Sequence, residues 1–408
     1  MKDRPRTLLL EANGTHWVAV CLDTFGQGVF SARSVGLNAK SRSRTFTKLF
    51  GERYADAGYM ADWREAFCTD DSLDVDVCNI TNLLEFHSSR PKIRDFDLVI
   101  ILHSAAGDRM AILNHTAGWF QGRRGKLAMF IGNEYDQLDE KIAFARNADV
   151  DYLCTQLPIE TARQLYVDCP AQVVAMPHAL NPRVYFRRPE ITRETDVGFI
   201  GDLYERLIGD TERTDIVKFF ATEGEARGLR CDIRAKRMPR EEWALFLNRC
   251  RTVVGAESGT YFLDRDSRAL TCAKKYLKRA PAASFSDVFE HCFAGGPPGL
   301  NGKAISSRHF EPIGTKTCQV LIEGSYNGIL EPDVHYMAVK RDLSNIDVVI
   351  DRMKDPEARN RVTDAAYTHV IASHTYGHRV RHLIQSVFDP SRPLMSPAAG
   401  PTFQPTSA

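Results

Sequence analysis

The strongest constraint on the fold is an alternation of apolar, strand-like runs with segments of helical periodicity, present in both halves of the chain. Residues 96–102 (FDLVIIL) give the clearest strand signal of the first half, because a nearly continuous apolar run suits a strand covered on both faces. A second series begins with residues 196–200 (DVGFI). Strands that alternate with helices predict parallel sheets, and 408 residues are enough for two such α/β domains.

The remaining elements follow from the same patterns. In the first half we expect further strands at residues 7–10, 126–131, 152–155 and 172–176, and helices at 137–147 and 158–167. In the second half we expect strands at residues 230–233, 252–255 and 318–323, and helices at 211–224, 240–250, 308–313, 357–373 and 376–388.

Proline and glycine indicate where the domains divide. Residues 177–193 hold three prolines and no clear period, which is typical of a linker, so we expect one domain over 1–185 and another over 186–375. Residues 264–304 interrupt the second series and predict an insertion with one helix near 287–292 and a glycine-proline loop, either a lid or disordered. The helix at 376–388 is expected to cross back to the first domain, and the tail 389–408 to be disordered.

Composition excludes several classes of protein. The formal net charge is +1, without the basic stripe of a nucleic-acid binder. No apolar run is long enough to span a membrane or act as a signal peptide, so we expect a cytoplasmic protein. The ten cysteines include no C-x-x-C pair, which argues against zinc sites and favours small buried thiols in a reducing compartment. No motif for a resident metal stands out; the lone D-x-D at Asp264–Asp266 has no supporting strand pattern.

Polar residues gather at the ends of the strands in the second half. In open α/β sheets, ligands bind beyond the carboxyl ends of the strands. Four segments converge there, and from them come the candidate binding residues Gly201, Tyr204, Arg206, Met238, Glu257, Ser258, Gly259, Ser307, Arg308 and Glu311.

These residue types suit a nucleoside diphosphate. A glycine after a strand lets backbone N–H groups approach a diphosphate, and the helix start at Ser307 favours an anion. An arginine such as Arg308 binds phosphate oxygens with two parallel N–H groups. Carboxylates such as Glu257 and Glu311 accept hydrogen bonds from ribose or sugar hydroxyls, although they would equally serve as helix caps or surface charges.

The order of these segments resembles that of the group 1 glycosyltransferases with the GT-B fold, and more closely the branch related to spore-maturation glycosyltransferases. The resemblance covers about residues 95–388 and is most specific in SSRHFEPIGTKTCQVLIEG (residues 306–324), followed by PDVHY (332–336) and ASHTY (372–376). It implies two doubly wound, Rossmann-like domains facing a central cleft, with the nucleotide sugar held by the second domain.

The resemblance also implies roles for single residues. Glu311 would bind the ribose hydroxyls, the turn around Met238 would contact the base through its backbone, and Arg206 lies where the family places a phosphate-binding side chain. Many members carry two glutamates in a Glu-x7-Glu arrangement, from which this chain departs. If residues 264–304 are an insertion, Glu257 is the equivalent of the first, sugar-contacting glutamate.

The first domain is then expected to hold the acceptor, a glycan, a lipid-linked sugar or a small molecule. His103, Glu134 and Asp136 follow strands and are the candidate bases of an inverting enzyme, although each could equally be structural. A retaining enzyme, slightly favoured by the resemblance, needs none of them.

The sequence therefore predicts a metal-independent glycosyltransferase of polysaccharide biosynthesis that uses a UDP- or GDP-linked sugar as substrate and no cofactor. Two alternatives stay open: a sugar-nucleotide epimerase or hydrolase of GT-B fold, and a non-catalytic module that binds nucleotide sugars or glycans. The sequence leaves the oligomeric state open.

Overall fold

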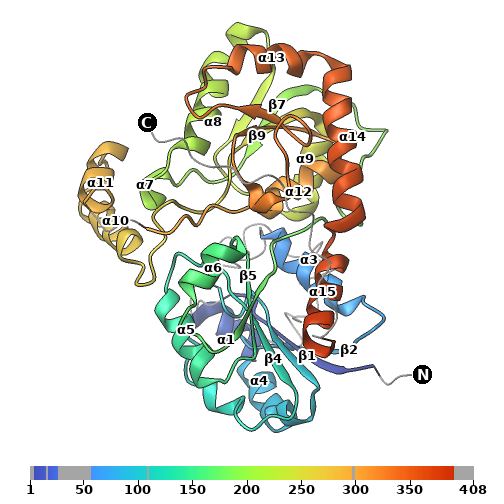
Figure 1. Ribbon diagram of the computed structural model, residues 1–408, viewed down its shortest axis with the longest axis vertical. Helices are drawn as coiled ribbons and strands as arrows, with labels where there is room; N and C mark the ends of the chain where they lie inside the picture. The colour runs from blue at the N-terminus through green and yellow to red at the C-terminus, as the bar shows by residue number, and fades with distance from the viewer. Residues whose placement is uncertain (1–3, 15–16, 26–56, 108–109, 296–298, 390–408) are drawn as a thin grey trace. The chain divides into compact units, whose positions relative to one another are not determined.

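The computed structural model of the chain describes residues 4–14, 17–25, 57–107, 110–295 and 299–389 (Figure 1). Its backbone contacts divide it into two compact units. The first contains the described residues up to 176 together with 265–267 and 380–389, and the second contains residues 177–264 and 268–379. Most of the tail predicted to be disordered, residues 390–408, lies outside the described residues, as do residues 296–298 of the glycine-proline loop.

The first unit is built on a six-stranded sheet in the order β2-β1-β3-β4-β5-β6, with every described pair parallel. Residues Leu98–Ile101 pair with Thr7–Leu10 on one side, and all four are buried, as their continuous apolar run predicted. The strands are β1 (Arg6–Glu11), β2 (Asp74–Asn79), β3 (Leu98–Ile101), β4 (Lys126–Phe130), β5 (Tyr152–Thr155) and β6 (Gln172–Ala175).

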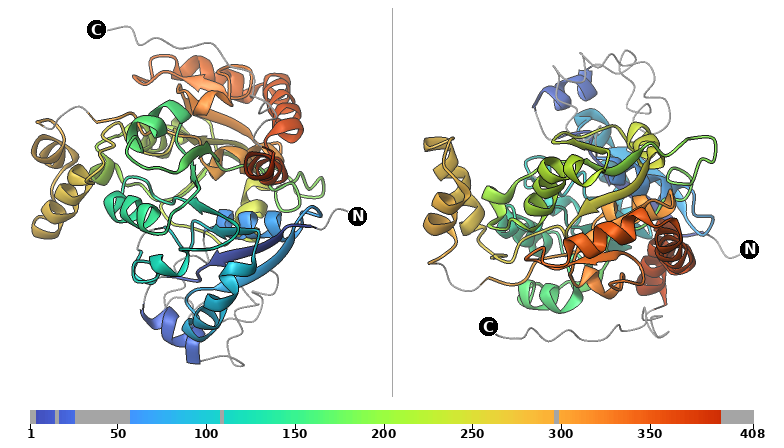
Figure 2. Two further views of the ribbon diagram at one scale, coloured as in Figure 1. Left: turned by 60° about the horizontal axis from the view of Figure 1, so that its bottom comes forward. Right: turned by 90° about the horizontal axis from the view of Figure 1, so that it is seen from above.

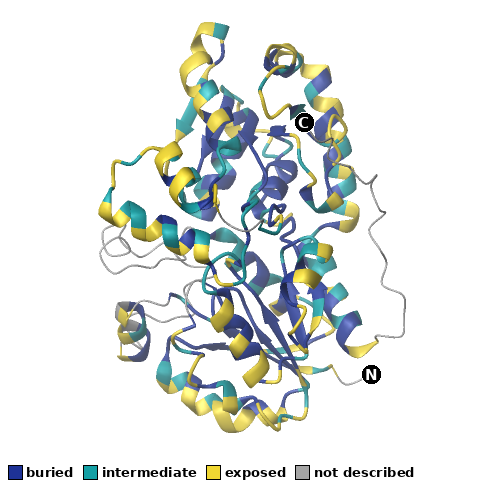
Figure 3. Cartoon of the chain, turned by 60° about the vertical axis from the view of Figure 1, so that its left-hand side comes forward, coloured by how far each residue is buried: buried dark blue, intermediate teal, exposed yellow. Residues whose placement is uncertain are grey.

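Helices and short turns of 3-10 helix connect these strands. In Figure 3 the central strands of the sheet are buried, whereas the helices carry exposed outer faces. The connecting elements are α1 (Trp17–Phe25), α3 (Gly58–Cys68), α4 (Leu83–Ser89), η3 (Arg90–Asp95), η4 (Ala117–Trp119), α5 (Leu138–Asn147) and α6 (Ile159–Leu165).

The second unit contains a five-stranded parallel sheet in the order β11-β10-β9-β7-β8. The chain begins in β7, adds β8 on one side and then crosses to β9 on the other, so the order reverses between β7 and β9. Such a reversal point is where doubly wound sheets bind ligands. The strands are β7 (Thr195–Ile200), β8 (Cys231–Arg234), β9 (Cys250–Gly255), β10 (Cys318–Ile322) and β11 (Met337–Val339).

Helices lie on both faces of this sheet, where two apolar clusters pack, one around Trp243 and Phe310 and the other around Phe220 and Val320. The helices of this unit are α7 (Glu205–Ile208), α8 (Glu212–Glu223), η5 (Glu225–Arg227), α9 (Arg240–Arg249), α10 (Arg268–Arg279), α11 (Phe285–Cys292), α12 (Ser307–Gly314), η6 (Tyr326–Gly328), α13 (Ile346–Lys354) and α14 (Pro356–Ser373). The last helix, α15 (Tyr376–Phe388), begins in this unit, and its residues 380–388 belong to the first unit.

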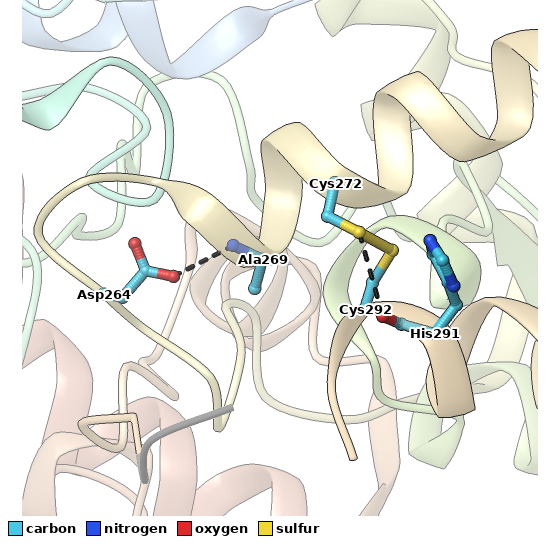
Figure 4. Close-up of a disulfide and its surroundings, with 5 residues drawn as sticks. All are labelled: Asp264, Ala269, Cys272, His291 and Cys292. Carbon is cyan, nitrogen blue, oxygen red and sulfur yellow. Dashed lines mark hydrogen bonds between the residues drawn. A yellow bond between two sulfur atoms is a disulfide. The ribbon is translucent and has the colours of Figure 1, made fainter. Parts of the chain in front are cut away.

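The insertion differs from its prediction, because it contains two helices rather than one. α10 and α11 run side by side (Figure 2) and share a small apolar cluster around Ala273, Val288 and Phe293. A disulfide joins Cys272 to Cys292 across them (Figure 4), so these two cysteines contradict the expectation of reduced thiols. Asp264, from the D-x-D segment, accepts hydrogen bonds from the backbone N–H groups of Arg268 and Ala269 at the start of α10.

The ends of the insertion lie next to one another. The backbone groups of Ser258 and Ala304 exchange two hydrogen bonds of 2.9 and 2.8 Å, and those of Leu263 and Leu300 form a second such pair. At Gly259 the backbone has φ +94°, and a Cβ would lie 2.1 Å from the carbonyl oxygen of Gly302. Only glycine fits this close approach. The chain thus leaves the sheet after β9 and returns beside its point of departure.

The prediction of two doubly wound, Rossmann-like α/β domains is confirmed by these sheets. The sequence patterns missed the strands β2 and β11 and the helices α1, α3, α4, α7, α10 and α13. Within the described part of the chain, no helix is both long and apolar enough to cross a lipid bilayer.

Candidate functional site

The predicted binding residues of the second unit gather at the carboxyl ends of β7 and β9. Gly201 directly follows β7, Glu257 follows β9 by two residues, and the first turn of α12 lies beside both strand ends. This is the reversal point of the sheet, where ligands bind in doubly wound folds.

The side chain of His309 fastens α12 to the end of β9. Its Nδ1 accepts a hydrogen bond of 2.9 Å from the N–H of Ser306, so the proton of the neutral ring lies on Nε2, which donates to the carbonyl oxygen of Ala256 at 3.1 Å. Burial, with a smaller effect of Arg213, lowers the pKa of His309 to about 3. The neutral ring therefore holds the helix start against the sheet.

Glu311 follows His309 by two positions in α12 and is buried. The indole N–H of Trp243, on α9, donates to its Oε2 at 2.6 Å, and the hydroxyl of Ser307 donates to the same carboxylate. Burial raises the pKa of Glu311, while the nearby Arg308 and the bond from Trp243 lower it. A hydrogen bond to a charged group contributes about 1.5–3 kcal/mol, so Trp243 is a strong positioning partner for this carboxylate.

Arg308 is half-buried beside Glu311 and links α12 to β7. Its guanidinium lies 5.3 Å from the ring centre of Trp243 and donates to the carbonyl oxygen of Ile200, the last residue of β7. A Cβ at position 201 would lie 3.1 Å from Arg308 Nη1, so Gly201 leaves room for the guanidinium. Burial lowers the pKa of Arg308, and repulsion by Arg213 and Arg237 lowers it further.

Arg213, on α8, connects three of the predicted residues. Its Nη1 donates to the hydroxyl of Tyr204 at 2.5 Å, and its Nη2 donates to Ser258 Oγ at 2.9 Å and to the carbonyl oxygen of Glu257 at 3.4 Å. The charge of Arg213 also lowers the pKa of Arg308 at the start of α12. Arg213 therefore connects this helix start with the loops that follow β7 and β9, and the three segments form one site.

Glu257 is buried and joins the end of β9 to the loop after β10. Its Oε1 accepts hydrogen bonds from the backbone N–H of Tyr326 at 2.6 Å and from Ser325 Oγ at 3.1 Å. A Cβ on Gly324 would lie only 2.4 Å from Glu257 Oε2, so the loop passes directly over the carboxylate. Burial raises the pKa of Glu257, although the bond from Tyr326 and the charge of Lys303 oppose this effect.

Lys303 is a residue that the sequence analysis missed. It stands eight positions before Glu311 (311 − 303 = 8), where the Glu-x7-Glu pattern has its first glutamate. Its ammonium group is buried and forms ion pairs with Asp210 and, at 3.0 Å, with Glu212. Lys303 therefore holds the returning end of the insertion against the start of α8. The carboxylate that lies close to the site is instead that of Glu257.

Two further predicted residues have other partners in the structure. Arg206 donates to the carbonyl oxygens of Pro281 and Ala283, at 3.0 and 2.9 Å, and so holds the insertion to α7. Met238, just before α9, is half-buried against the apolar cluster that contains Trp243.

The candidate acceptor residues lie in the first unit. His103 is buried after β3 among aromatic rings, 5.6 Å from the ring centre of Trp63 and 5.1 Å from that of Phe130. Glu134 is buried after β4, where Tyr166 Oη donates to its Oε1 at 2.7 Å and Thr155 donates to the same oxygen.

Burial raises the pKa of Glu134 to about 6 against the opposing effect of these bonds. Asp136 is half-buried, and its carbonyl oxygen accepts from Lys141 Nζ at 2.8 Å.

The described residues contain no group of three or more histidine, cysteine or acidic side chains placed to hold a metal ion. At the carboxyl edge of the second sheet, Arg213 and Arg308 lie close to the carboxylates Glu257 and Glu311. That edge is therefore suited to an anionic ligand with hydroxyl groups.

Comparison with known protein families gives a match within the second unit. Residues 238–385, which contain α9, α12 and the strands β9, β10 and β11, match the family model described as glycosyl transferase-like. This segment of the second unit therefore matches a glycosyltransferase family, as predicted, while the spore-maturation branch stays a prediction. No curated protein sequence matches the chain significantly.

Solved structures with a related arrangement include HepE from Anabaena in complex with UDP and glucose, at 10% identity and a TM-score of 0.46 over 94% of this chain and 100% of that one. BGT of T4 phage in complex with UDP-glucose aligns at 10% identity and a TM-score of 0.49, over 94% of this chain and 99% of that one.

The buried histidines of the second unit predict a loss of stability in acid. Burial lowers the pKa of His178, His309 and His374 to about 3, against about 6.5 in an unfolded chain. Between these values the unfolded chain binds more protons, so the free energy of unfolding falls as the pH is lowered from about 6.5. Each histidine contributes about 1.4 kcal/mol per pH unit to this slope.

Urea titrations at several pH values between 4.5 and 6.5 measure the slope. We expect His374→Asn to reduce it by about 1.4 kcal/mol per pH unit, because its amide oxygen can still accept the bond that Arg379 donates to His374 Nδ1. Replacement of the exposed His291 by Gln is the control and should leave the slope unchanged. Equal slopes for wild type and His374→Asn would contradict the assignment.

Proposed function

We propose that this protein transfers a sugar from a nucleoside-diphosphate sugar to a hydroxyl group of a glycan, lipid-linked or small-molecule acceptor. The observation that carries the proposal is the start of α12, which brings Arg308 and Glu311 together at the reversal point of the second sheet. The guanidinium is suited to the donor's diphosphate, and the carboxylate is suited to its ribose hydroxyls. Both groups lie at a helix N-terminus, which favours an anion.

The diphosphate is proposed to bind among the arginines. Arg213 and Arg237 both lower the pKa of Arg308, so these like charges repel one another, although Glu311 opposes the effect on Arg308 and Asp202 pairs with Arg237 at 2.7 Å. An anion between them converts this repulsion into attraction and stabilises the charge that develops on the leaving diphosphate. With these side chains and the N–H groups of α12, transfer needs no bound metal ion.

The nucleoside is proposed to lie over α9 and α12. Trp243 and Ser307 fix the Glu311 carboxylate by their hydrogen bonds, and a carboxylate has further lone pairs to accept bonds from ribose hydroxyls. The turn at Met238 directly precedes α9, the helix that carries Trp243, and is proposed to contact the base through its backbone. A UDP- or GDP-linked sugar is the donor that we propose on this basis.

The sugar is proposed to contact the loop after β9. Glu257 is the buried carboxylate of this loop, and Ser258 and Gly259 follow it with their backbone held by Ala304 and Gly302. Tyr326 and Ser325 bond to Glu257 Oε1, and the loop at Gly324 lies next to Oε2, so a sugar hydroxyl is proposed to approach Oε2 beside this loop. Glu257 is thus both a support of the loop after β10 and a candidate sugar contact.

The donor site predicts specific ligand responses. Thermal-shift titrations with UDP and GDP should raise the melting temperature of the wild type with one of them, because a ligand bound to the folded state alone stabilises it. Glu311→Ala should bind that nucleotide at least tenfold more weakly, and turnover of the matching sugar nucleotide should fall by at least a hundredfold.

The control for this experiment is Glu290→Ala, which removes an exposed carboxylate on α11 and should match the wild type in both measurements. The proposal fails if Glu311→Ala turns over donor as fast as the wild type does. A protein that binds the nucleotide but transfers sugar to no acceptor would instead support a binding module.

Retention of configuration at the anomeric carbon is the second part of the proposal. Two of the three candidate bases, His103 and Glu134, are buried, His103 among aromatic rings and Glu134 with its carboxylate already hydrogen-bonded. That leaves half-buried Asp136 as the remaining candidate for an inverting mechanism. A retaining enzyme avoids this requirement, since the leaving diphosphate can accept the proton of the acceptor.

We therefore expect the first-formed product to keep the anomeric configuration of the donor, as measured from the proton coupling constant of the anomeric hydrogen during turnover. Asp136→Asn should keep at least half of the wild-type kcat. An inverted product together with a loss of kcat of more than a hundredfold in Asp136→Asn would show that the enzyme inverts and that Asp136 is its base.

A further inference from the structure

A second cationic pocket lies at the opposite, amino edge of the sheet in the second unit. It has a volume of about 220 Å³ and is lined at the beginnings of β9 and β10 by Arg251 and Lys316, and on α14 by Arg359. Arg187 and Arg193, from the segment before β7, complete the cationic lining. The donor site is at the other ends of the same strands, so this pocket is a separate place.

The positive charge of the pocket is only partly neutralised. Lys316 pairs with Asp364 at 2.8 Å and Arg251 with Asp196 at 2.7 Å, and Asp196 is shared with Arg230. Arg187, Arg193 and Arg359 instead donate to neutral acceptors, mainly backbone carbonyl oxygens, and no described carboxylate forms an ion pair with them. Five cations and one carboxylate therefore line the pocket.

The like charges act on one another across this space. The pKa of Arg193 is lowered to about 10, first by burial and then by the charge of Arg187, with a further contribution from Arg359. Burial and the charge of Arg251 likewise lower the pKa of Arg359, although Asp196 and Asp355 oppose part of this effect. Keeping uncompensated cations close together in a partly buried place destabilises the folded chain unless an anion lies between them.

Some of the hydrogen-bond donors of the residues that line the pocket are not used by the described bonds. The described bonds of Arg251 use only Nη1, to Asp196, and those of Arg359 use only Nη1, to the carbonyl oxygen of Met353. The remaining nitrogens of both guanidinium groups and the side-chain amide of the exposed Asn360 are available at the pocket. Paired N–H donors on a guanidinium match the oxygen atoms of a phosphate group.

The volume restricts the ligand. Pockets for whole drug-sized molecules have about 300–1,000 Å³, and about 220 Å³ is below that range. From the charge, the unused donors and the volume, we propose that this pocket binds a small phosphate-type oxyanion, namely inorganic phosphate, diphosphate or the phosphate group of a phosphomonoester. The site is independent of the donor site and of the reaction performed there.

Inorganic phosphate is the probe for the test, since it is the smallest ligand of the class. At constant ionic strength, phosphate should raise the melting temperature of the full-length protein above that in chloride, and calorimetry should show saturable binding. Arg359→Gln and Lys316→Gln should each weaken phosphate binding at least tenfold. Added sodium chloride should also weaken binding, because exposed charges are screened.

Two controls separate this site from others. Arg361→Gln removes an exposed cation of α14 that does not line the pocket and should leave phosphate binding unchanged. Arg308→Gln removes the cation of the donor site and should also leave it unchanged, whether or not the protein binds nucleotides. Absence of saturable binding to the wild type, or loss of binding in Arg308→Gln but in neither pocket variant, would overturn the proposal.

If one pocket variant fails to fold, as judged by its circular dichroism and melting temperature without phosphate, the other provides the test. Arg359 and Lys316 come from different elements, α14 and the turn before β10, so their effects on folding are separate.

Discussion

The attachment of α12 to the second sheet is the interaction on which the site depends. A neutral, buried His309 bonds to Ser306 in its own turn and to Ala256 at the end of β9, while Arg308 reaches the end of β7. Glu311 is then fixed from a third direction by Trp243 of α9. Three separate elements thus position an eight-residue helix, and the residues proposed to bind the nucleotide and diphosphate take their places from it.

Electrostatics explains why this edge of the sheet suits an anion. Arginines are gathered there at a cost, because burial and mutual repulsion disfavour their charged forms. The carboxylates Glu257 and Glu311 are held by hydrogen bonds with backbone, indole and hydroxyl donors, while Arg213 and Arg308 donate to carbonyl and hydroxyl oxygens. The amino edge of the same sheet shows a related pattern, because Arg187, Arg193 and Arg359 donate to carbonyl oxygens rather than to carboxylates.

The sequence predicts the parts of the fold in which local pattern and burial agree. The run at residues 98–101 is apolar throughout and forms a buried central strand, and the segments that became β5 and α15 were placed at their observed bounds. β2 (DVDVCN) was missed because it alternates acidic and apolar residues and has exposed positions, as befits an edge strand. α10 was missed because the nearby prolines and glycines suggested a loop.

The site was predictable where it depended on residues close in sequence, and not where it depended on contacts between distant ones. The segment from Ser307 to Glu311 carries both the helix start and the family resemblance. Its partners Trp243 and Ala256 are 68 and 53 positions away, and no periodicity indicates such pairs. The same holds for the pairing of Cys272 with Cys292 and for the ion pairs of Lys303, which depend on how the insertion returns to the sheet.

The most direct test of the account is backbone hydrogen–deuterium exchange of the full chain with and without UDP or GDP. The account predicts that the nucleotide that binds will slow exchange in residues 200–206, 255–259 and 306–311, since these segments form one site at the ends of β7, β9 and the start of α12. Protection confined to other segments, or no protection by either nucleotide at saturating concentration, would contradict it.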